Sequence, residues 1–520
     1  MKRLAWTLLA LMVGLAPCAG FAANADAVPG RYDLPRLGDP GGGAISPAEL
    51  DEIGRQELVQ LRRYDLILQD PLVTNYIRDV GHRIAAQSDS PGMNIHYYVI
   101  ATPVMNSFAF PGRNVAIFTG LFTATDNENE LAGVIAHETA HVTQHHMARQ
   151  VADMQGMGWK ELAGLLGGII LGAATGNPQV GMATIMGTQA AIIQHQINFT
   201  RHDEEEADRV GIGFMARAGY NPDGMAQMFQ KFEIMSRGEL KPPAFLIDHP
   251  MDTVRISDAS ERAHQMPKIT HKDSRSYLLM RARARVLVAD RVEDALAYFN
   301  GIDTSKLSET GKNAIAYGRA LCLIRMNRPG KALAILTPLL DKHPDVVAYH
   351  LGVGNAELKN GETDKALATF EHTAKIFPDS LAVQVDQAQA LLAANRAGDA
   401  KTVLQNAAMD NGNNPLVLHL LAEASSQAGN LGEARYYLSQ YYELNGKLDA
   451  AITQIRLALD DAHPDSYEKA RYRARLEDLQ KARKMHKKDA RNQMSWHFGV
   501  QRVPEPYGPG FLPPPPPREQ

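Results

Sequence analysis

The chain has 520 residues, which is enough for more than one domain, and its formal net charge of −4 gives no indication of a nucleic-acid partner. It contains two cysteines, Cys18 and Cys322. No stretch of about eighteen residues is continuously apolar, which argues against a helix that spans a membrane.

The first residues have the pattern of a secretory signal peptide. Lys2 and Arg3 precede an apolar run and then the small residues of "CAGFAANA", and the apolar core is too short to span a bilayer. The pattern predicts a leader over residues 1–22, with cleavage after Ala22 or Ala25, and export to a bacterial periplasm. Cleavage removes one of the two cysteines, so no intramolecular disulfide is expected in the mature chain.

The segment "GVIAHETAHVTQHHMARQ" contains an HExxH motif on an expected helix. His137 and His141 are four residues apart, so they share one helix face and can ligate a single metal ion. Glu138 lies beside that face, where it can take a proton from a water held by the metal. Asn127 followed by Glu130 predicts a capping box at the start of this helix.

A catalytic zinc usually has a third protein ligand, and "TRHDEEEADRVGIGFMARAGYNP", residues 200–222, is a candidate source. It has helical spacing, an acidic first turn, and a glycine and a proline that predict its end. Glu204 and Asp208 share one face, as a ligand and a carboxylate that orients a histidine ring would. Glu205 and Glu206 are also acidic, so spacing alone leaves the choice of ligand open.

HETAH followed by R-x-x-E-x-x-A-D resembles the gluzincin metallopeptidases related to HtpX and the CAAX prenyl endopeptidase. The resemblance implies a zincin-type fold and one Zn²⁺ per chain, with His137, His141 and Glu204 as ligands, Glu138 as general base and Asp208 as the orienting carboxylate. Among the consecutive acids, Glu204 is selected by its register with Arg201 and Asp208 in the family pattern.

The stretch "MNSFAFPGRNVAIFTGLF" resembles the N-x-F-A-x-P-G segment of the same family. We interpret it as a turn followed by a strand over residues 115–119, which leads into a helix. A strand edge exposed beside the zinc would hold an extended substrate by backbone hydrogen bonds. The alternative is an ordinary internal hairpin, and for the individual side chains this is the preferred interpretation.

The stretch "LIDHPMDTVRISD" resembles the family element H-P-x-x-x-x-R, matched by His249 and Arg255. Either side chain could stabilise the oxyanion that forms when water attacks a peptide carbonyl. His249 could instead occupy the open zinc position and restrain the enzyme, or simply cap a helix from a loop.

His145 and His146 follow the motif directly. On a continuous helix His145 extends the face of His141 by one turn. A fourth protein ligand would close the site, so both histidines are interpreted as lying behind the ligands or facing solvent.

Residues 161–177, "ELAGLLGGIILGAATGN", form the longest apolar stretch after the leader. About fourteen apolar residues are too few for a span and are typical of a buried or interfacial segment. Three interpretations remain: a core helix, an element that touches a membrane surface, or a lid whose glycines permit hinging.

From about residue 270 the chain repeats with a period of 34. Three sets of small or apolar residues keep this step: Ala332, Ala366, Ala400 and Ala434; Leu336, Phe370, Leu404 and Leu438; Ala320, Gly354, Ala388 and Ala422. The pattern is that of tetratricopeptide repeats, in which helix pairs stack into a solenoid with a concave, protein-binding surface.

The expected fold is mainly α with a small β element. Its parts are a signal peptide (1–22), an N-terminal segment and loop (23–46), a zinc metallopeptidase domain (47–268), a tetratricopeptide-repeat solenoid (269–465), a basic helix (466–495) and a proline-rich disordered tail (496–520).

An exported peptidase of this family with tetratricopeptide repeats is similar to bacterial enzymes of outer-membrane quality control. The resemblance implies hydrolysis of unfolded or misassembled outer-membrane proteins in the periplasm, with repeats that engage stalled clients or the assembly machinery, and contact with the outer membrane. The alternatives are a mainly non-proteolytic chaperone or scaffold, and a repeat protein whose zinc is structural and has four protein ligands.

Overall fold

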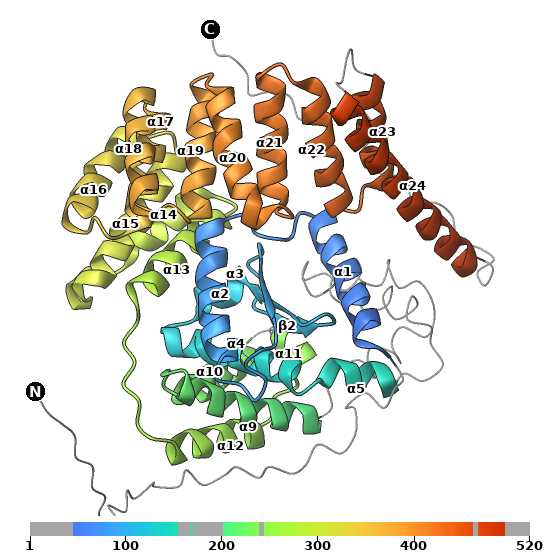
Figure 1. Ribbon diagram of the computed structural model, residues 1–520. Coiled ribbons are helices and arrows are strands. Elements are labelled where there is room, and N and C mark those ends of the chain that lie inside the picture. Colours follow the sequence, from blue (N-terminus) through green and yellow to red (C-terminus); the bar gives the residue numbers. More distant parts are fainter. Residues whose placement is uncertain are drawn as a thin grey trace, which may run out of the picture. The chain divides into compact units, whose positions relative to one another are not determined.

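The computed structural model describes residues 45–153, 201–238, 244–460 and 466–494, together with Gly168 and Gly172 (Figure 1). The first part of the chain contains α1 (Pro47–Arg63), α2 (Pro71–Ala85), β1 (His96–Ile100), β2 (Ser107–Phe110), β3 (Asn114–Phe118), α3 (Thr119–Ala124), α4 (Glu128–Thr143), α5 (His146–Asp153), α9 (Arg201–Arg217), α10 (Asp223–Gly238), α11 (Ala244–Asp248) and α12 (Thr253–Gln265). The expected signal peptide, the apolar stretch 161–177 and the proline-rich tail lie outside the described residues, apart from the two glycines.

The second part is helical throughout its described length. It contains α13 (Arg275–Leu287), α14 (Val292–Gly301), a short 3-10 turn (Thr304–Lys306), α15 (Glu309–Arg325), α16 (Pro329–Lys342), α17 (Val347–Lys359), α18 (Thr363–Ile376), α19 (Leu381–Ala393), α20 (Ala397–Asn411), α21 (Pro415–Gln427), α22 (Leu431–Leu444), α23 (Leu448–Asp460) and α24 (Ser466–Met494). The expected fold class, mainly α with a small β element, is confirmed. Among the described residues, no helix combines the length and the apolar character that crossing a bilayer requires.

The sheet has three strands in the order β1-β3-β2. β1 pairs with β3 in parallel and β2 pairs with β3 antiparallel, across a turn in which Gly112 and Arg113 have positive φ. The prediction for this stretch was partly wrong. The strand expected over residues 115–119 is β3, which is central rather than at the edge, and Thr119 already belongs to α3. The segment interpreted as a turn contains the edge strand β2.

Helix α4 is the centre of the first part. All sixteen of its residues are buried, because α2, α9, α10 and the sheet pack around it. The capping box predicted at its start is half formed. The Asn127 side chain accepts a hydrogen bond from the backbone N–H of Glu130. The Glu130 carboxylate accepts from the backbone N–H of Asp126, whereas a capping box would have it accept from that of Asn127. A helix buried on all sides carries the HExxH motif, so polar residues there need a specific partner.

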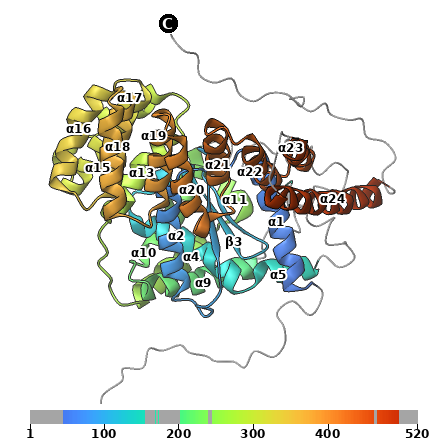
Figure 2. The same cartoon turned by 45° about the horizontal axis from the view of Figure 1, so that its top comes forward.

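Helices α15 to α22 form the predicted series of antiparallel pairs, each packed on the next (Figures 1 and 2). The periodic alanines are buried, with Ala332, Ala366 and Ala400 fully inaccessible. Gly354 lies where α17 crosses α18, and a Cβ there would meet the Phe370 ring at 2.6 Å. The small and apolar residues that recur every 34 positions are therefore those at which successive helices pack together.

The two parts of the sequence are joined by buried polar contacts. Glu128, at the start of α4, accepts hydrogen bonds from the hydroxyls of Tyr76 and Ser274 and from the backbone N–H of Ser274, which caps α13. Arg283 of α13 forms an ion pair with Asp70, the N-cap of α2, at 2.7 Å.

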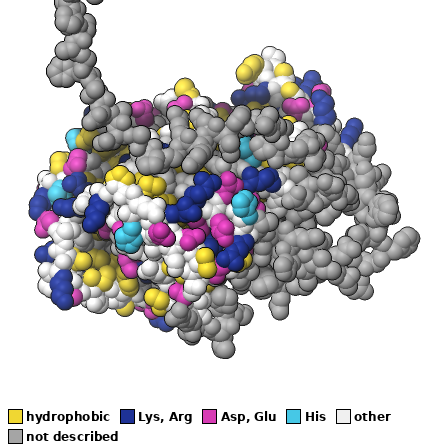
Figure 3. Space-filling view, turned by 90° about the horizontal axis from the view of Figure 1, so that it is seen from below, with side chains coloured by type: hydrophobic (Ala, Val, Ile, Leu, Met, Phe, Trp, Pro, Cys, Tyr) yellow, Lys and Arg dark blue, Asp and Glu magenta, His cyan; other side chains and the backbone are white. Residues whose placement is uncertain are grey.

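On the face seen in Figure 3, Lys and Arg side chains lie beside Asp and Glu side chains.

Candidate metal centre

Helices α4 and α9 supply the candidate ligands. His137 and His141 lie one turn apart on α4, and Glu204 lies in the first turn of α9. The two helices approach closely because Gly211 has no side chain: a Cβ there would be 3.1 Å from the carbonyl oxygen of Ala136. This close crossing brings the carboxylate of Glu204 to the two imidazoles.

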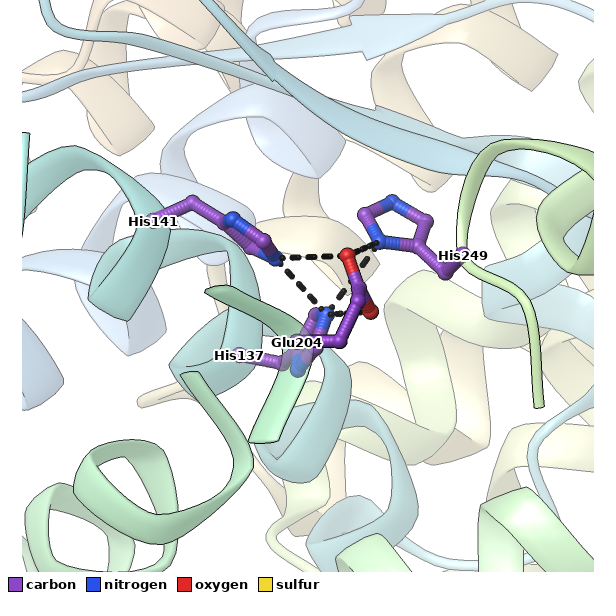
Figure 4. Close-up of side chains that lie close together, drawn as sticks. All are labelled: His137, His141, Glu204 and His249. Carbon is purple, nitrogen blue, oxygen red and sulfur yellow. Dashed lines mark hydrogen bonds and ion pairs between the residues drawn. The ribbon is translucent and has the colours of Figure 1, made fainter. Parts of the chain in front are cut away.

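The ligand atoms form a compact set (Figure 4). Nε2 of His137 and Nε2 of His141 are 3.0 Å apart, and each is 3.4 Å from an oxygen of Glu204. In a tetrahedral zinc site with bonds of about 2.0–2.1 Å, ligand atoms are separated by about 3.3 Å. The observed spacings are close to that value, and all three side chains are at most 1% exposed. The residues therefore fit a small divalent metal ion.

A second layer of side chains holds these ligands in place. Nδ1 of His137 lies 2.9 Å from Oδ1 of Asp208. Arg255 donates from Nε and Nη2 to the two oxygens of Asp208, and its Nη1 lies 2.9 Å from Oε2 of Glu204. Nη1 also donates to the carbonyl of Pro250. Each nitrogen of the guanidinium thus contacts a protein oxygen, which favours a role for Arg255 in holding two carboxylates over the oxyanion role also considered for it.

His249 joins the ligand set from the loop that follows α11. Its Nδ1 lies 3.0 Å from Oε1 of Glu204 and 3.3 Å from Nε2 of His137, and the side chain is 1% exposed. The loop is tied to the sheet because Asn106 donates from its side chain to Asp248 at 2.7 Å. Of the alternatives considered for His249, occupation of the fourth metal position agrees best with this placement.

Glu138 lies at the edge of the same set. Its Oε1 accepts from the hydroxyl of Ser107 at 2.7 Å and lies 3.5 Å from Nε2 of His249. Its other oxygen is buried and has no hydrogen-bond partner among the residues that the structure describes. Such an atom is costly to leave without a donor, so it indicates a place for a water or a substrate group. The carboxylate is therefore suited to exchange a proton with a molecule bound there.

Of the two histidines after the motif, His145 does not continue the helix as expected, whereas His146 lies behind a ligand. Helix α4 ends at Thr143, and His145 has a left-handed φ of 57°. The chain therefore turns, and His145 does not extend the face of His141. His146 comes back instead, with Nδ1 at 2.8 Å from Nδ1 of His141, which places it behind a ligand as one interpretation expected.

The charges of the site are set by burial and by mutual contact. Burial disfavours charge on His137, but the carboxylates of Asp208 and Glu204 outweigh it and raise the pKa of His137 to about 10. Burial dominates at His141 and holds its pKa well below the usual value. Although burial also opposes ionisation of Glu204, the imidazoles around it hold its pKa well below normal. A metal ion that binds would displace the proton of His137.

Sequence reasoning did not single out Ser107, Asn106 or Asp248. The first two lie in the stretch "MNSFAFPG", where a family resemblance was noted but the side chains were interpreted as an ordinary hairpin. The available signal was the pair of polar residues Asn106 and Ser107 directly before an apolar run, because buried polar side chains need partners.

The fold and the site define a metallopeptidase joined to a helical repeat array. In agreement, the model of peptidase family M48 matches residues 71–263, and tetratricopeptide-repeat models match residues 317–380 and 357–424.

Two relatives of the same name are similar over almost the whole chain, and a third is similar over about a third of it. The chain is 31% identical over 488 residues to the beta-barrel assembly-enhancing protease of Escherichia coli (strain K12), covering 92% of this chain and 96% of that protein. The protein of the same name from Yersinia pestis is 31% identical over 481 residues, with 91% and 97% covered. The mitochondrial metalloendopeptidase OMA1 of Schizosaccharomyces pombe is 28% identical over 188 residues, with 36% and 52% covered. The chain belongs to the family of beta-barrel assembly-enhancing proteases, which are M48 metalloendopeptidases with tetratricopeptide repeats.

Proposed function

We propose that the chain is a zinc-dependent endopeptidase of the periplasm that hydrolyses unfolded or misassembled outer-membrane proteins and assists their assembly. The observation that carries the proposal is the convergence of His137, His141 and Glu204 beside the carboxylate of Glu138. Two imidazoles and one carboxylate are a usual donor set for catalytic zinc. The names of the relatives supply the connection with β-barrel assembly.

In this proposal the side chains divide the work of hydrolysis. When bound, zinc supplies a Lewis acid that makes water more acidic and polarises the substrate carbonyl. Glu138 takes the proton of the attacking water and returns it to the leaving amine. Ser107 holds one oxygen of Glu138, which leaves the other for the proton transfer. Asp208 and Arg255 keep His137 and Glu204 in place.

Substrate would bind in extended form along β2, whose four residues are buried, so the strand would have to be uncovered before a substrate could pair with it. This strand lies at the edge of the described sheet, and its first residue, Ser107, touches the general base. Backbone pairing to a strand edge requires an unfolded segment and selects weakly among side chains. Both properties suit an enzyme whose clients are proteins that failed to fold.

His249 would restrain the enzyme. Its side chain lies within the metal-ligand set. If His249 occupied the fourth coordination position of the metal, that position would be closed to water and to the substrate carbonyl. A zinc-loaded His249→Ala protein separates the two roles: cleavage becomes faster if His249 blocks the site and slower if it stabilises an oxyanion.

The test is cleavage of an unfolded outer-membrane β-barrel precursor by purified protein, followed by gel electrophoresis. Wild type should cut, a chelator should stop the reaction, and added Zn²⁺ should restore it. Glu138→Gln should retain zinc and lose cleavage. If wild type cuts nothing and Glu138→Gln supports outer-membrane assembly fully in cells, the scaffold function, which the repeat array favours, replaces the proteolytic one.

A further inference from the structure

A chain of polar contacts starts at His141 and leads away from the candidate metal. Nδ1 of His141 faces Nδ1 of His146 at 2.8 Å, and Nε2 of His146 lies 3.2 Å from Oε2 of Glu206. His146 is fully buried. Each contact in the chain fixes the next: if Glu206 accepts the Nε2 proton, Nδ1 of His146 becomes an acceptor, and His141 must carry its own proton on Nδ1.

Two features hold this chain of contacts in one arrangement. The left-handed turn at His145 directs the side chain of His146 back under α4. Arg149 donates to Glu206 at 2.9 Å, to Asp203 at 2.8 Å and to the carbonyl of Gln144 at 2.9 Å. The guanidinium thus joins α5 to both the end of α4 and the start of α9.

We propose that His146 is a positioning residue for the metal: it accepts the Nδ1 proton of His141 and thereby directs the Nε2 lone pair of His141 into the ligand set. The proposal rests on the zinc site proposed above and concerns how this site is built. His137 is oriented by the carboxylate of Asp208, whereas His141 is oriented by an imidazole that is itself held by Glu206.

The same residues could be interpreted as a second metal site, because His146, Asp203 and Glu206 also lie close together. Arg149 argues against this interpretation. Its guanidinium lies within 3 Å of both carboxylates, so the positive charge that a metal would provide is already present. A second cation would have to displace or repel it.

Two amide substitutions distinguish the two nitrogens of His146. The amide of His146→Asn reaches the position of Nδ1 and can still accept from His141, whereas that of His146→Gln reaches the position of Nε2 and keeps only the contact with Glu206. Exposed His202 on α9 provides the matched control, His202→Gln. All variants are polar at the changed position, and circular dichroism establishes that they fold.

Zinc affinity is measured by competition with a chromogenic chelator, and ligand geometry by the visible spectrum of the Co²⁺ protein. Loss of a group that orients a metal ligand typically weakens binding about 10–100-fold. We expect this loss and an altered Co²⁺ spectrum for His146→Gln, with His146→Asn and His202→Gln close to wild type. Equal losses for Asn and Gln, or no loss for Gln, would overturn the proposal, as would two zinc ions per wild-type chain. These readouts do not require cleavage, so they stand apart from the test of the proposed function.

Discussion

The hydroxyl of Ser107 donates a 2.7 Å hydrogen bond to Oε1 of Glu138 and so connects the edge strand β2 to the helix that carries the general base. The strand proposed to hold substrate and the group proposed to move the proton are therefore in direct contact. A small shift of β2 would move the carboxylate relative to the peptide bond.

Ser107→Ala should lower kcat about 10–100-fold and leave KM nearly unchanged, because a hydrogen bond to a charged group contributes about 1.5–3 kcal/mol and here holds the base rather than the substrate. Ser107→Thr keeps the hydroxyl and should keep most of the activity. The measurement is steady-state cleavage of an unfolded protein labelled with a quenched fluorophore. An unchanged kcat for Ser107→Ala would show that Glu138 needs no support from β2.

Arg255→Lys should weaken both the fold and metal binding. Arg255 is 2% exposed and makes a two-pronged contact with Asp208 as well as an ion pair with Glu204, and a lysine cannot reproduce the planar fork. Breaking a buried charge pair costs about 3–5 kcal/mol, and a retained positive charge should reduce the loss to about half. Calorimetry measures the fall in Tm.

The control for that variant is Arg201→Lys. Arg201 is exposed and pairs at the surface with Glu205 and Asp252, so little change in Tm is expected. If Arg255→Lys and Arg201→Lys both had the Tm of wild type, the contacts of Arg255 with the carboxylates of the site would not contribute to the stability of the fold.

The residues of the site that share a helix face could be predicted from their spacing in the sequence. His137 and His141 share a face because a helix brings residues four apart together. The choice of Glu204 among three consecutive glutamates needed the family resemblance as well, because spacing alone left it open. The repeats were predictable for a similar reason, since each unit repeats the contacts of the last.

The parts that depend on a turn or on tertiary contact could not be predicted. His146 replaces His145 behind His141 because the chain leaves the helix at a left-handed residue that is not glycine, which propensities do not signal. Arg255 was considered, as an alternative to His249, for the oxyanion role, and its partner Asp208 on α9 is known only once the two helices are packed. The edge strand β2 was missed because its residues are all buried, so no alternation of polar and apolar side chains marks it.

Gly354→Ala should destabilise the repeat array, although alanine is the better helix former. The added methyl group would lie 2.6 Å from the ring of Phe370, and overpacking of this kind costs about 1–3 kcal/mol against a gain of about 1 kcal/mol from helix propensity. Gly330→Ala is the matched control, because an added Cβ there would meet no atom within 4 Å beyond its own helix backbone and chain neighbours, among the described residues. Thermal unfolding followed by circular dichroism should show a lower Tm for the first variant and an equal or higher Tm for the second. The reverse order would contradict the helix crossing.

Asp386, on α19, is a half-buried carboxyl group that makes stability depend on pH. Burial raises its pKa from 3.8 to about 6, although the guanidinium of Arg283 and the amide of Asn355, which donates to it at 2.7 Å, oppose the shift. Because the pKa in the folded protein exceeds the unfolded value, the folded state binds the proton more tightly. The contribution of Asp386 to the free energy of unfolding is therefore fully present below about pH 4 and is lost as the pH rises through about 6.

Asp386→Asn removes this titration while keeping an acceptor for Asn355. A shift of one pKa unit corresponds to about 1.4 kcal/mol, and partial exposure of the group reduces the effect, so the variant should gain about 1–2 kcal/mol over wild type at pH 8 and lose that advantage at pH 4. Urea unfolding of both proteins across this range, compared as a difference, isolates the one group. Asp379→Asn, at an exposed position just before α19, is the matched control variant. A constant difference between wild type and Asp386→Asn from pH 4 to 8 would show that the carboxyl group ionises as freely in the fold as in the unfolded chain.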